Sequence, residues 1–203
     1  ARQFVDVSVM AASGETQAAK TSFPLNEEDL WLTLEAGTYW TKDSLPALKA
    51  MVQTNAGVEF EGPVDVTGEI YRMREGKQPE KVLSGFVLPA NKPVRLSELS
   101  ALPSGSYEMR LRAVTDSDTL EYDHPFVLFS LSDRHPGDGK KFFYCCIGDT
   151  VSAGRPARLM VGSAADSVSL FYMLFCEDRI LEEKVFHFSD TIQHFTFSDV
   201  PAG

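Results

Sequence analysis

The stretch Leu102-Pro103-Ser104-Gly105-Ser106-Tyr107 decides the fold class, because its proline–glycine turn opens directly into a strand of alternating residues. Apolar positions beyond the turn are separated by charged ones: Tyr107, Met109, Leu111 and Ala113 alternate with Glu108, Arg110 and Arg112. A period of two predicts a β-strand with one buried face and one solvated face. This strand indicates a chain built from antiparallel sheets.

A similar turn, Val200-Pro201-Ala202-Gly203, ends the chain, and both turns follow an apolar stretch. Their prolines lie about 100 residues apart, which is the size of a small β-sandwich. The chain is therefore predicted to be an array of similar modules. Because no strand follows the second turn, we expect an incomplete last module and a chain that is a piece of a longer protein.

Alternating apolar residues recur throughout residues 29–131, and no window carries a sustained helical stripe. Strands are predicted at Leu30 to Leu34, Leu45 to Thr54, Val64 to Met73, Val82 to Leu88 and Leu120 to Phe129. Turns are indicated at Asn55-Ala56-Gly57, Arg74 to Glu80 and Thr115 to Asp118. About seven strands in about a hundred residues is typical of an immunoglobulin-like or fibronectin-III-like sandwich. We predict one complete sandwich here and an all-β chain.

Residues 132–140 form the best candidate linker, because Asp133 to Gly139 carries glycine, proline and charge but almost nothing apolar. Strands resume beyond it at Phe142 to Ile147, Ala157 to Gly162, Val168 to Cys176, Arg179 to Phe188 and Ile192 to Phe197. We predict that residues 141–203 form a second, incomplete sandwich of the same kind.

Residues 1–28 are predicted to form a hairpin, because Val5, Val7 and Val9 alternate with polar residues and Ser13-Gly14-Glu15 supplies a turn. This hairpin is interpreted as the closing pair of strands of a preceding sandwich. An unpaired sheet edge invites strand addition. We therefore hypothesise that the hairpin completes the 141–203 module, within one chain or by strand exchange between copies. The alternative is that it packs against the central module.

The composition is that of an ordinary globular chain, with 203 residues of which 43% are hydrophobic and 24% are charged. Its formal charge of −10 argues against a nucleic-acid partner, because phosphate neutralisation needs clustered lysine and arginine. No apolar run approaches the length of about 20 residues that a membrane-spanning helix needs. The amino terminus also lacks the pattern of a signal peptide.

The three cysteines, Cys145, Cys146 and Cys176, are too few and wrongly spaced for a zinc ribbon or a disulfide framework. Cys145 and Cys146 point to opposite faces if they lie in a strand, so at most one could meet Cys176. Free, partly buried thiols are the favoured interpretation. A disulfide from Cys145 or Cys146 to Cys176 is the alternative.

Residues capable of chemistry are scattered, and each has a structural explanation. The four histidines, His124, His135, His187 and His194, are predicted to lie on the surface rather than to bind zinc. Ser104 and Ser106 belong to a turn that its proline and glycine already explain. The acidic runs at Asn26 to Asp29 and Asp116 to Asp118 are interpreted as solvated turns rather than calcium sites. We expect no catalytic residue, no cofactor and no metal site.

Two dense aromatic runs, Phe142-Phe143-Tyr144 and Phe171-Tyr172-Met173-Leu174-Phe175, exceed what one face of a strand can bury. Roughly half of these side chains must be covered by something other than their own core. Cover by a neighbouring module is the favoured interpretation, and an exposed partner surface is the alternative.

Several segments resemble the macroglobulin-like domains of the bacterial α-2-macroglobulin family. They are Val5 to Phe23, Asp43-Ser44-Leu45-Pro46-Ala47-Leu48, Gly62-Pro63-Val64, Leu102 to Arg110 and Ser152 to Leu159. The resemblance covers nearly the whole chain. It implies a string of sandwiches that forms part of a protease-trapping shell, an endopeptidase inhibitor of the cell envelope, either periplasmic or an outer-membrane lipoprotein.

The chain departs from the family pattern where that pattern carries chemistry. Cys176-Glu177-Asp178-Arg179 lacks the glutamine of a thioester motif, and neither Cys145 nor Cys146 is followed by one. No long stretch reads as a protease bait. The resemblance thus implies a non-catalytic scaffold whose partners are neighbouring domains of the parent chain and, through the full-length protein, host or foreign proteases. A cell-envelope adhesion or carbohydrate-associated binding module is the alternative.

Overall fold

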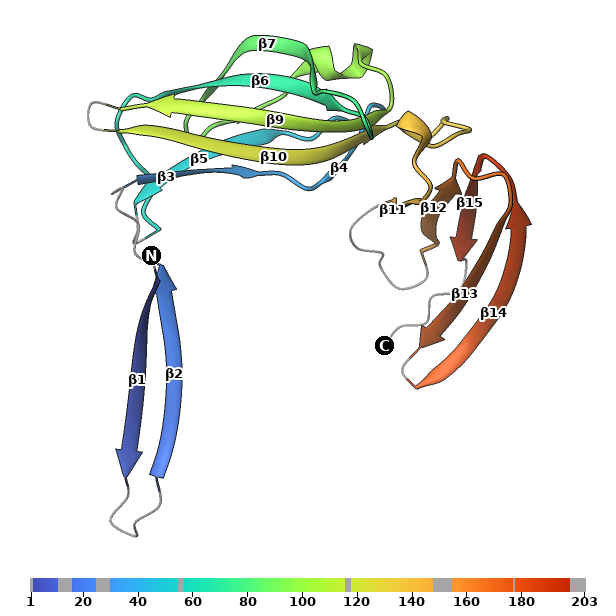
Figure 1. Cartoon of the computed structure of the whole chain (residues 1–203), viewed down its shortest axis with the longest axis horizontal. Helices are drawn as coiled ribbons and strands as arrows, with labels where there is room; N and C mark the ends of the chain where they lie inside the picture. The colour runs from blue at the N-terminus through green and yellow to red at the C-terminus, as the bar shows by residue number, and fades with distance from the viewer. Residues whose placement is uncertain are drawn as a thin grey trace.

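The structure, a computed structural model, describes residues 2–10, 16–24, 30–54, 57–115, 118–147, 155–176 and 178–197. This part of the chain holds fifteen strands, two short 3₁₀ segments and no α-helix. The all-β prediction is confirmed. The strands form several sheets that gather into a central unit (residues 30–131) and a C-terminal unit (residues 141–197), with the separate hairpin β1–β2 preceding them (Figure 1).

The central unit consists of two sheets. The larger has the order β4-β10-β9-β6-β7 and the smaller the order β3-β5-β8. Their bounds are β3 (Leu30–Glu35), β4 (Tyr39–Thr41), β5 (Leu48–Thr54), β6 (Asp65–Met73), β7 (Glu80–Pro89), β8 (Pro93–Val94), β9 (Gly105–Val114) and β10 (Thr119–Phe129). A 3₁₀ segment, Ser97–Ala101, precedes β9. Both sheets contribute to one hydrophobic core, an arrangement consistent with a β-sandwich.

Alternation along the strands builds this core as the sequence predicts. The burial pattern of β9 is strictly alternating through Tyr107, Met109, Leu111 and Ala113, all at most 2% exposed. Leu30, Leu32 and Leu34 line the inner face of the opposite sheet. Burial of each such large side chain stabilises the fold by roughly 1.5–3 kcal/mol.

Two short strands, β4 and β8, were missed by the sequence prediction. β4 pairs in parallel with the end of β10, placing Trp40 opposite Leu128. Trp40 is 1% exposed and stacks on Phe126 with ring centroids 3.8 Å apart, while its Nε1 donates to the Gly37 carbonyl. Strands of two or three residues are too short to show a period, so only long-range pairing defines them.

A side chain of β9 stabilises the turn that precedes this strand. The Tyr107 hydroxyl donates to the Pro103 carbonyl oxygen at 2.6 Å, and the ring is 1% exposed. The turn and the strand that decide the fold class are therefore one hydrogen-bonded element.

The C-terminal unit is also built from strands of alternating residues, but fewer of its side chains are buried. Its strands are β11 (Phe143–Cys146), β12 (Ala157–Ser163), β13 (Val168–Cys176), β14 (Arg179–Phe188) and β15 (Thr191–Phe197). The predicted strands all occur here, within a residue at either end. They form a three-stranded sheet, β11-β12-β15, and a curved two-stranded sheet, β13-β14 (Figure 1).

The two units pack on each other through one face of β11. Phe129 at the end of β10 joins a buried cluster with Phe143, Cys145, Met160 and Ile192. The ring of Tyr39 in β4 also lies edge-on to that of Phe143, with centroids 6.3 Å apart. Cover by a neighbouring unit is thus confirmed for Phe143.

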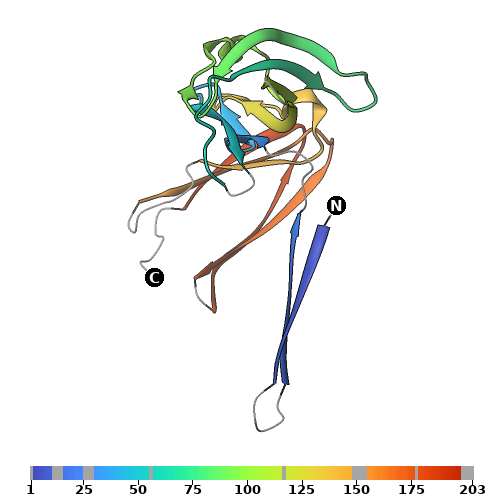
Figure 2. The ribbon, with the colours of Figure 1, turned by 90° about the vertical axis from the view of Figure 1, so that its left-hand side faces the viewer.

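The amino-terminal hairpin pairs β1 (Arg2–Met10) with β2 (Thr16–Pro24) in a two-stranded antiparallel sheet. It projects away from the central unit (Figures 1 and 2). Among the described strands β1 pairs only with β2, so completion of the C-terminal unit within one chain is not observed. Strand exchange between copies stays a prediction.

Candidate interaction surfaces

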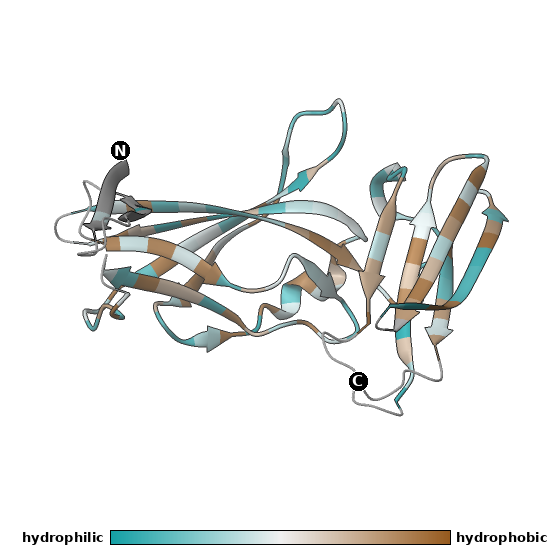
Figure 3. Cartoon of the chain, turned by 90° about the horizontal axis from the view of Figure 1, so that it is seen from below, coloured by the Kyte–Doolittle hydropathy of each residue, from teal (hydrophilic) through white to brown (hydrophobic). Residues whose placement is uncertain are grey.

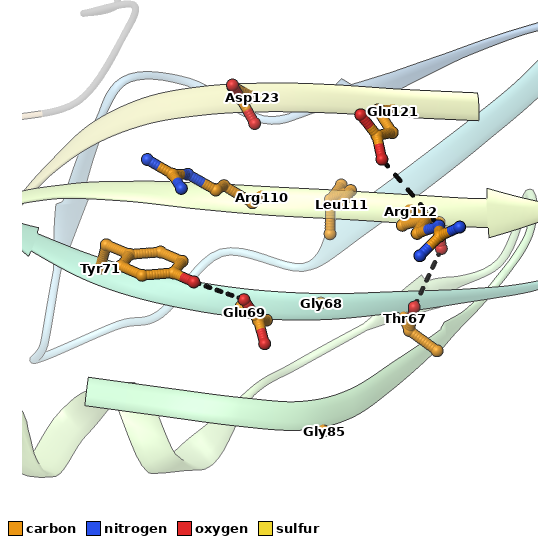
Figure 4. A pocket seen from close by; sticks show the side chains of 10 residues that line it. All are labelled: Thr67, Gly68, Glu69, Tyr71, Gly85, Arg110, Leu111, Arg112, Glu121 and Asp123. Atoms are coloured by element: carbon orange, nitrogen blue, oxygen red, sulfur yellow. Dashed lines mark hydrogen bonds and ion pairs between the residues drawn. The ribbon is translucent and has the colours of Figure 1, made fainter. Parts of the chain in front are cut away.

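The outer face of the five-stranded sheet is hollowed into a polar depression of about 580 Å³ (Figure 4). We call this surface the polar hollow. Strands β6, β7, β9 and β10 all contribute to it, and the lining residues are Thr67, Gly68, Glu69, Tyr71, Gly85, Arg110, Leu111, Arg112, Glu121 and Asp123. Most of these residues lie at the alternate positions of their strands that face solvent.

A bulged glycine keeps one wall of the polar hollow open. The pairing of β6 with β7 shifts between Gly68 and Glu69, so that Gly85 is an extra residue in β7. Gly85 has a φ of +77°. No atom lies within 4 Å of where its Cβ would stand. A bulge with a left-handed glycine bends a strand and strengthens its twist.

Two charged residues of the polar hollow, Glu69 and Arg110, are paired with charged residues at its edge. Glu69 accepts hydrogen bonds from the Lys81 ammonium at 2.6 Å and from the Tyr71 hydroxyl at 2.5 Å. The Arg110 guanidinium lies 4.2 Å from the centroid of the Tyr71 ring, and its Nε donates to Glu108 at 2.8 Å. The result is a ladder of alternating charge across the sheet.

This pairing favours the charged form of each group. Hydrogen bonds from Lys81 and Tyr71 lower the pKa of Glu69, and the bond to Glu69 raises the pKa of Lys81. The hydrogen bond to Glu108 raises the pKa of Arg110. A general acid or base works best with a pKa near the operating pH. The pKa values of Glu69, Lys81 and Arg110 instead move away from neutrality, so this surface suits polar contact better than proton transfer.

A second depression, of about 200 Å³, lies in the C-terminal unit between its two sheets. We call it the apolar hollow, because apolar and aromatic side chains line it: Phe142, Tyr144, Leu159, Val161, Leu170, Tyr172, Phe195 and Phe197. Tyr172 stacks on Phe186 with centroids 5.8 Å apart and meets Phe195 edge-on. Phe142 and Tyr144 remain 63% and 50% exposed, so this interior is only partly covered.

The outer face of β13–β14 carries a further apolar surface. Phe171, Met173, Phe175, Ile180 and Val185 are between 43% and 56% exposed. Apolar residues recur along the strands of the C-terminal unit (Figure 3). The prediction that Phe171 to Phe175 exceeds what its own core can bury is confirmed. In the described part of the chain, no neighbouring unit covers these side chains.

One predicted surface histidine is buried, so that prediction was wrong. His124 is 6% exposed, because it occupies an inward position of β10. Its ring stacks against Trp40 with centroids 5.7 Å apart, and its Nε2 lies 3.1 Å from the Gly37 carbonyl oxygen. His135, His187 and His194 are exposed, as predicted.

The other candidate residues are not brought together into a reactive group. Ser104 Oγ is buried without a hydrogen-bond partner among the described residues, so no base activates it there. Within the same residues, no cluster of histidine, cysteine, aspartate and glutamate could hold a metal ion. The acidic candidates at 26–29 and 116–117 lie outside the described residues.

The cysteines match the favoured prediction where the structure describes them. Cys145 is buried in the cluster between the units, where its Sγ donates to the Cys146 carbonyl oxygen at 3.4 Å, and Cys146 is an exposed free thiol. The side chain of Cys176 lies outside the described residues. Cys146 does not form the alternative disulfide.

The polar hollow itself was not predicted. Alternation identified Arg110 and Arg112 as solvated positions, but their concave arrangement depends on the bulge in the neighbouring strand. The available signal was Gly85, a glycine in the middle of the predicted strand Val82 to Leu88.

Comparison with known proteins found neither a protein-family model that matches the chain nor a curated protein that is similar to it. In the described residues no helix is long and apolar enough to cross a membrane.

Proposed function

We propose that this chain is a non-catalytic scaffold segment of an α-2-macroglobulin-like, protease-trapping protein of the bacterial cell envelope. The observation that carries the proposal is the packed boundary between the units, where Phe129 of the central unit joins Phe143, Met160 and Ile192. A shell built from a string of sandwiches needs such boundaries to hold its modules in place.

The distribution of charged groups supports a structural role. In the polar hollow, Glu69 pairs with Lys81 and Arg110 pairs with Glu108, which lowers the pKa of Glu69 and raises the pKa values of Lys81 and Arg110. An active site is recognised by pKa values tuned toward the pH at which it works. The exposed large apolar side chains, in contrast, lie mostly in the C-terminal unit, where a further module would meet it.

The finer fold assignment, tandem immunoglobulin-like or macroglobulin-like sandwiches, belongs to the same proposal. It is supported by the two-sheet core of residues 30–131 and by the recurrence of strands beyond residue 140. The segments that resemble macroglobulin-like domains, such as Gly62-Pro63-Val64 and Leu102 to Arg110, add to it.

The test is a trapping assay on the full-length protein that contains this chain. A trapped protease still cleaves a small fluorogenic peptide but no longer cleaves a large protein substrate, and it elutes with the trap in size-exclusion chromatography. We expect this behaviour with at least one broad-specificity serine protease. Equal loss of both activities, or no co-elution with any protease of a panel, would contradict the proposal.

A second measurement addresses the alternative of a carbohydrate-associated module. The 203-residue chain would be assayed against a panel of envelope polysaccharides by surface plasmon resonance, beside a Tyr71→Ala variant. Scaffold function predicts no saturable binding. Saturable binding that Tyr71→Ala abolishes would assign a ligand to the polar hollow and overturn the scaffold proposal.

A further inference from the structure

The linker between the two units (residues 132–140) lies at their boundary (Figure 1), and it forms hydrogen bonds with each of them in turn. Just before it, the Leu131 amide donates to Asp43 Oδ2 at 2.7 Å and the Ser130 hydroxyl donates to the same oxygen at 3.1 Å. Asp43 lies just beyond β4. These bonds fix the start of the linker to the central unit.

The next residues of the linker bind the C-terminal unit. The Arg134 carbonyl accepts from the Ile192 amide at 2.8 Å and from the Thr191 hydroxyl at 3.2 Å. His135 Nδ1 lies 2.6 Å from the Asp190 carbonyl oxygen. The chain therefore crosses to β15 within a few residues.

Asp138 then brings the linker back to the central unit. Its Oδ2 accepts from the Ser106 amide at 3.0 Å, while its Oδ1 lies 3.0 Å from Arg72 Nε and 2.7 Å from Arg72 Nη2. The side chains of Asp138 and Arg72 are 6% and 16% exposed. A nearly buried carboxylate held by one backbone amide and a two-pronged arginine is a strong, directional contact.

The turn before β9 is shaped to receive this carboxylate. A Cβ on Gly105 would overlap with Asp138 Oδ2, and a Cβ on Gly137 would stand 2.5 Å from the Ser104 carbonyl carbon. Both glycines thus allow a close approach that other residues would prevent. The glycine of the fold-deciding turn is required by the linker that docks on it.

The chain then crosses to the C-terminal unit a second time. The Lys140 carbonyl accepts from the Ala164 amide at 2.9 Å, and the Lys141 carbonyl accepts from the Ser163 hydroxyl at 2.6 Å. Ser163 is 2% exposed. Asp138 is therefore a central-unit anchor that lies between two anchors on the C-terminal unit.

We propose that the linker is a clasp that holds the two units in one relative orientation. The clasp is closed when Asp138 lies against Gly105 and forms its ion pair with Arg72. The units cannot rotate against each other while Asp138 is seated, because both flanking segments of the linker are bonded to the C-terminal unit. Opening the clasp is the step by which their orientation can change. This inference does not depend on the proposed protease-trapping function.

The test compares Asp138→Asn with Asp65→Asn in the full 203-residue chain. The Asp138→Asn change keeps the size of the side chain but removes its charge. The control residue, Asp65, is an exposed aspartate of the central unit, at the start of β6. Limited digestion with trypsin reports access to the linker, which contains Arg134 and Lys140. Small-angle X-ray scattering reports the spread of distances between the units.

We expect Asp138→Asn to raise the cleavage rate at Arg134 and Lys140 by about tenfold, because these sites must detach locally before a protease can bind. The distance distribution should broaden at the same time, with Asp65→Asn indistinguishable from the parent chain. Unchanged linker cleavage and an unchanged distribution in Asp138→Asn would overturn the clasp.

A second variant covers the case in which Asp138→Asn unfolds the central unit and is cleaved throughout it. Gly137→Ala alters the linker alone and blocks its approach to Ser104. We expect faster cleavage confined to the linker, with the circular dichroism spectrum of the parent. Parent-like linker cleavage in Gly137→Ala would also overturn the proposal.

Discussion

The central and C-terminal units contain the same kind of alternating strands, but they bury them to different extents. Among the residues that the structure describes, twenty buried residues form the core of the central unit, and both of its sheets contribute to it. The buried cluster of the C-terminal unit has five members, and one of these, Phe129, belongs to the central unit. The second unit therefore depends on the first for part of its own buried core.

The difference has a simple geometric cause. In the central unit a five-stranded sheet covers a three-stranded one, so alternate residues of β3, β5 and β9 are buried between them. In the C-terminal unit the second sheet has only two strands, so the space between the sheets is partly open and side chains such as Phe142 and Tyr144 stay exposed. Exposed apolar surface of this kind marks a contact surface.

The largest effect is expected from removing the centre of the better-covered core. Trp40→Ala should lower the free energy of unfolding by about 3–5 kcal/mol, because it deletes a 1% exposed indole. Urea unfolding followed by circular dichroism measures the loss. Trp31→Ala is the matched control, since Trp31 is 44% exposed and should cost little. Equal losses in the two variants would contradict the assigned core.

A smaller effect is expected at the turn that opens β9. Tyr107→Phe keeps the buried ring but leaves the Pro103 carbonyl oxygen without its 2.6 Å hydrogen bond. The expected loss is about 1–2 kcal/mol in urea unfolding. Tyr144→Phe is the control, because Tyr144 is 50% exposed. A loss below that of the control would show that the hydrogen bond does not hold the turn.

A pH-dependent effect is expected where the linker begins. Hydrogen bonds, first from the Leu131 amide and then from the Thr41 hydroxyl, lower the pKa of Asp43 from its ordinary value of 3.8. A carboxylate with a lowered folded-state pKa contributes stability that is complete above its ordinary pKa and is lost as the pH falls through the folded value.

The Asp43→Asn variant should therefore be less stable than the parent at pH 6, and the difference should shrink as the pH falls below about 3.8. Thermal unfolding of both chains across this range measures it, with Asp65→Asn as the control. A difference that stays constant with pH would rule out a role for the charge of Asp43.

The smallest effect on stability is expected on the outer face of β13–β14. Replacing Phe171 and Phe175 together by serine should change the free energy of unfolding by no more than about 0.5 kcal/mol, because both side chains are more than half exposed. The variant should also self-associate less in sedimentation velocity at high concentration. A large loss of stability would mean that this face is covered within the chain.

Much of the fold could be predicted because long strands with one buried face carry a clear period. Val168–Cys176 and Arg179–Phe188 were predicted with the bounds that the structure has. Tyr39–Thr41 and Pro93–Val94 were missed, since strands this short are defined by partners far away in the chain.

The candidate surfaces were less accessible to prediction because they depend on tertiary contacts. His124 shares the buried face of β10 with Leu120 and Phe126, but its stacking on Trp40 of β4 does not follow from any local pattern. Composition identified Asp133 to Gly139 as a linker, but no local pattern shows that Asp138 would meet Arg72, a residue in a distant strand.

The dependence of the C-terminal unit on the central one is tested most directly by hydrogen–deuterium exchange on Phe129→Ala in the full chain. Phe129 is 5% exposed and is the central unit's residue in the shared cluster. We predict that amides of β11, β12 and β15 exchange much faster than in the parent, while those of β6 and β9 keep their protection. Unchanged protection in β11, β12 and β15, or an equal loss in both units, would show that the C-terminal unit does not depend on Phe129.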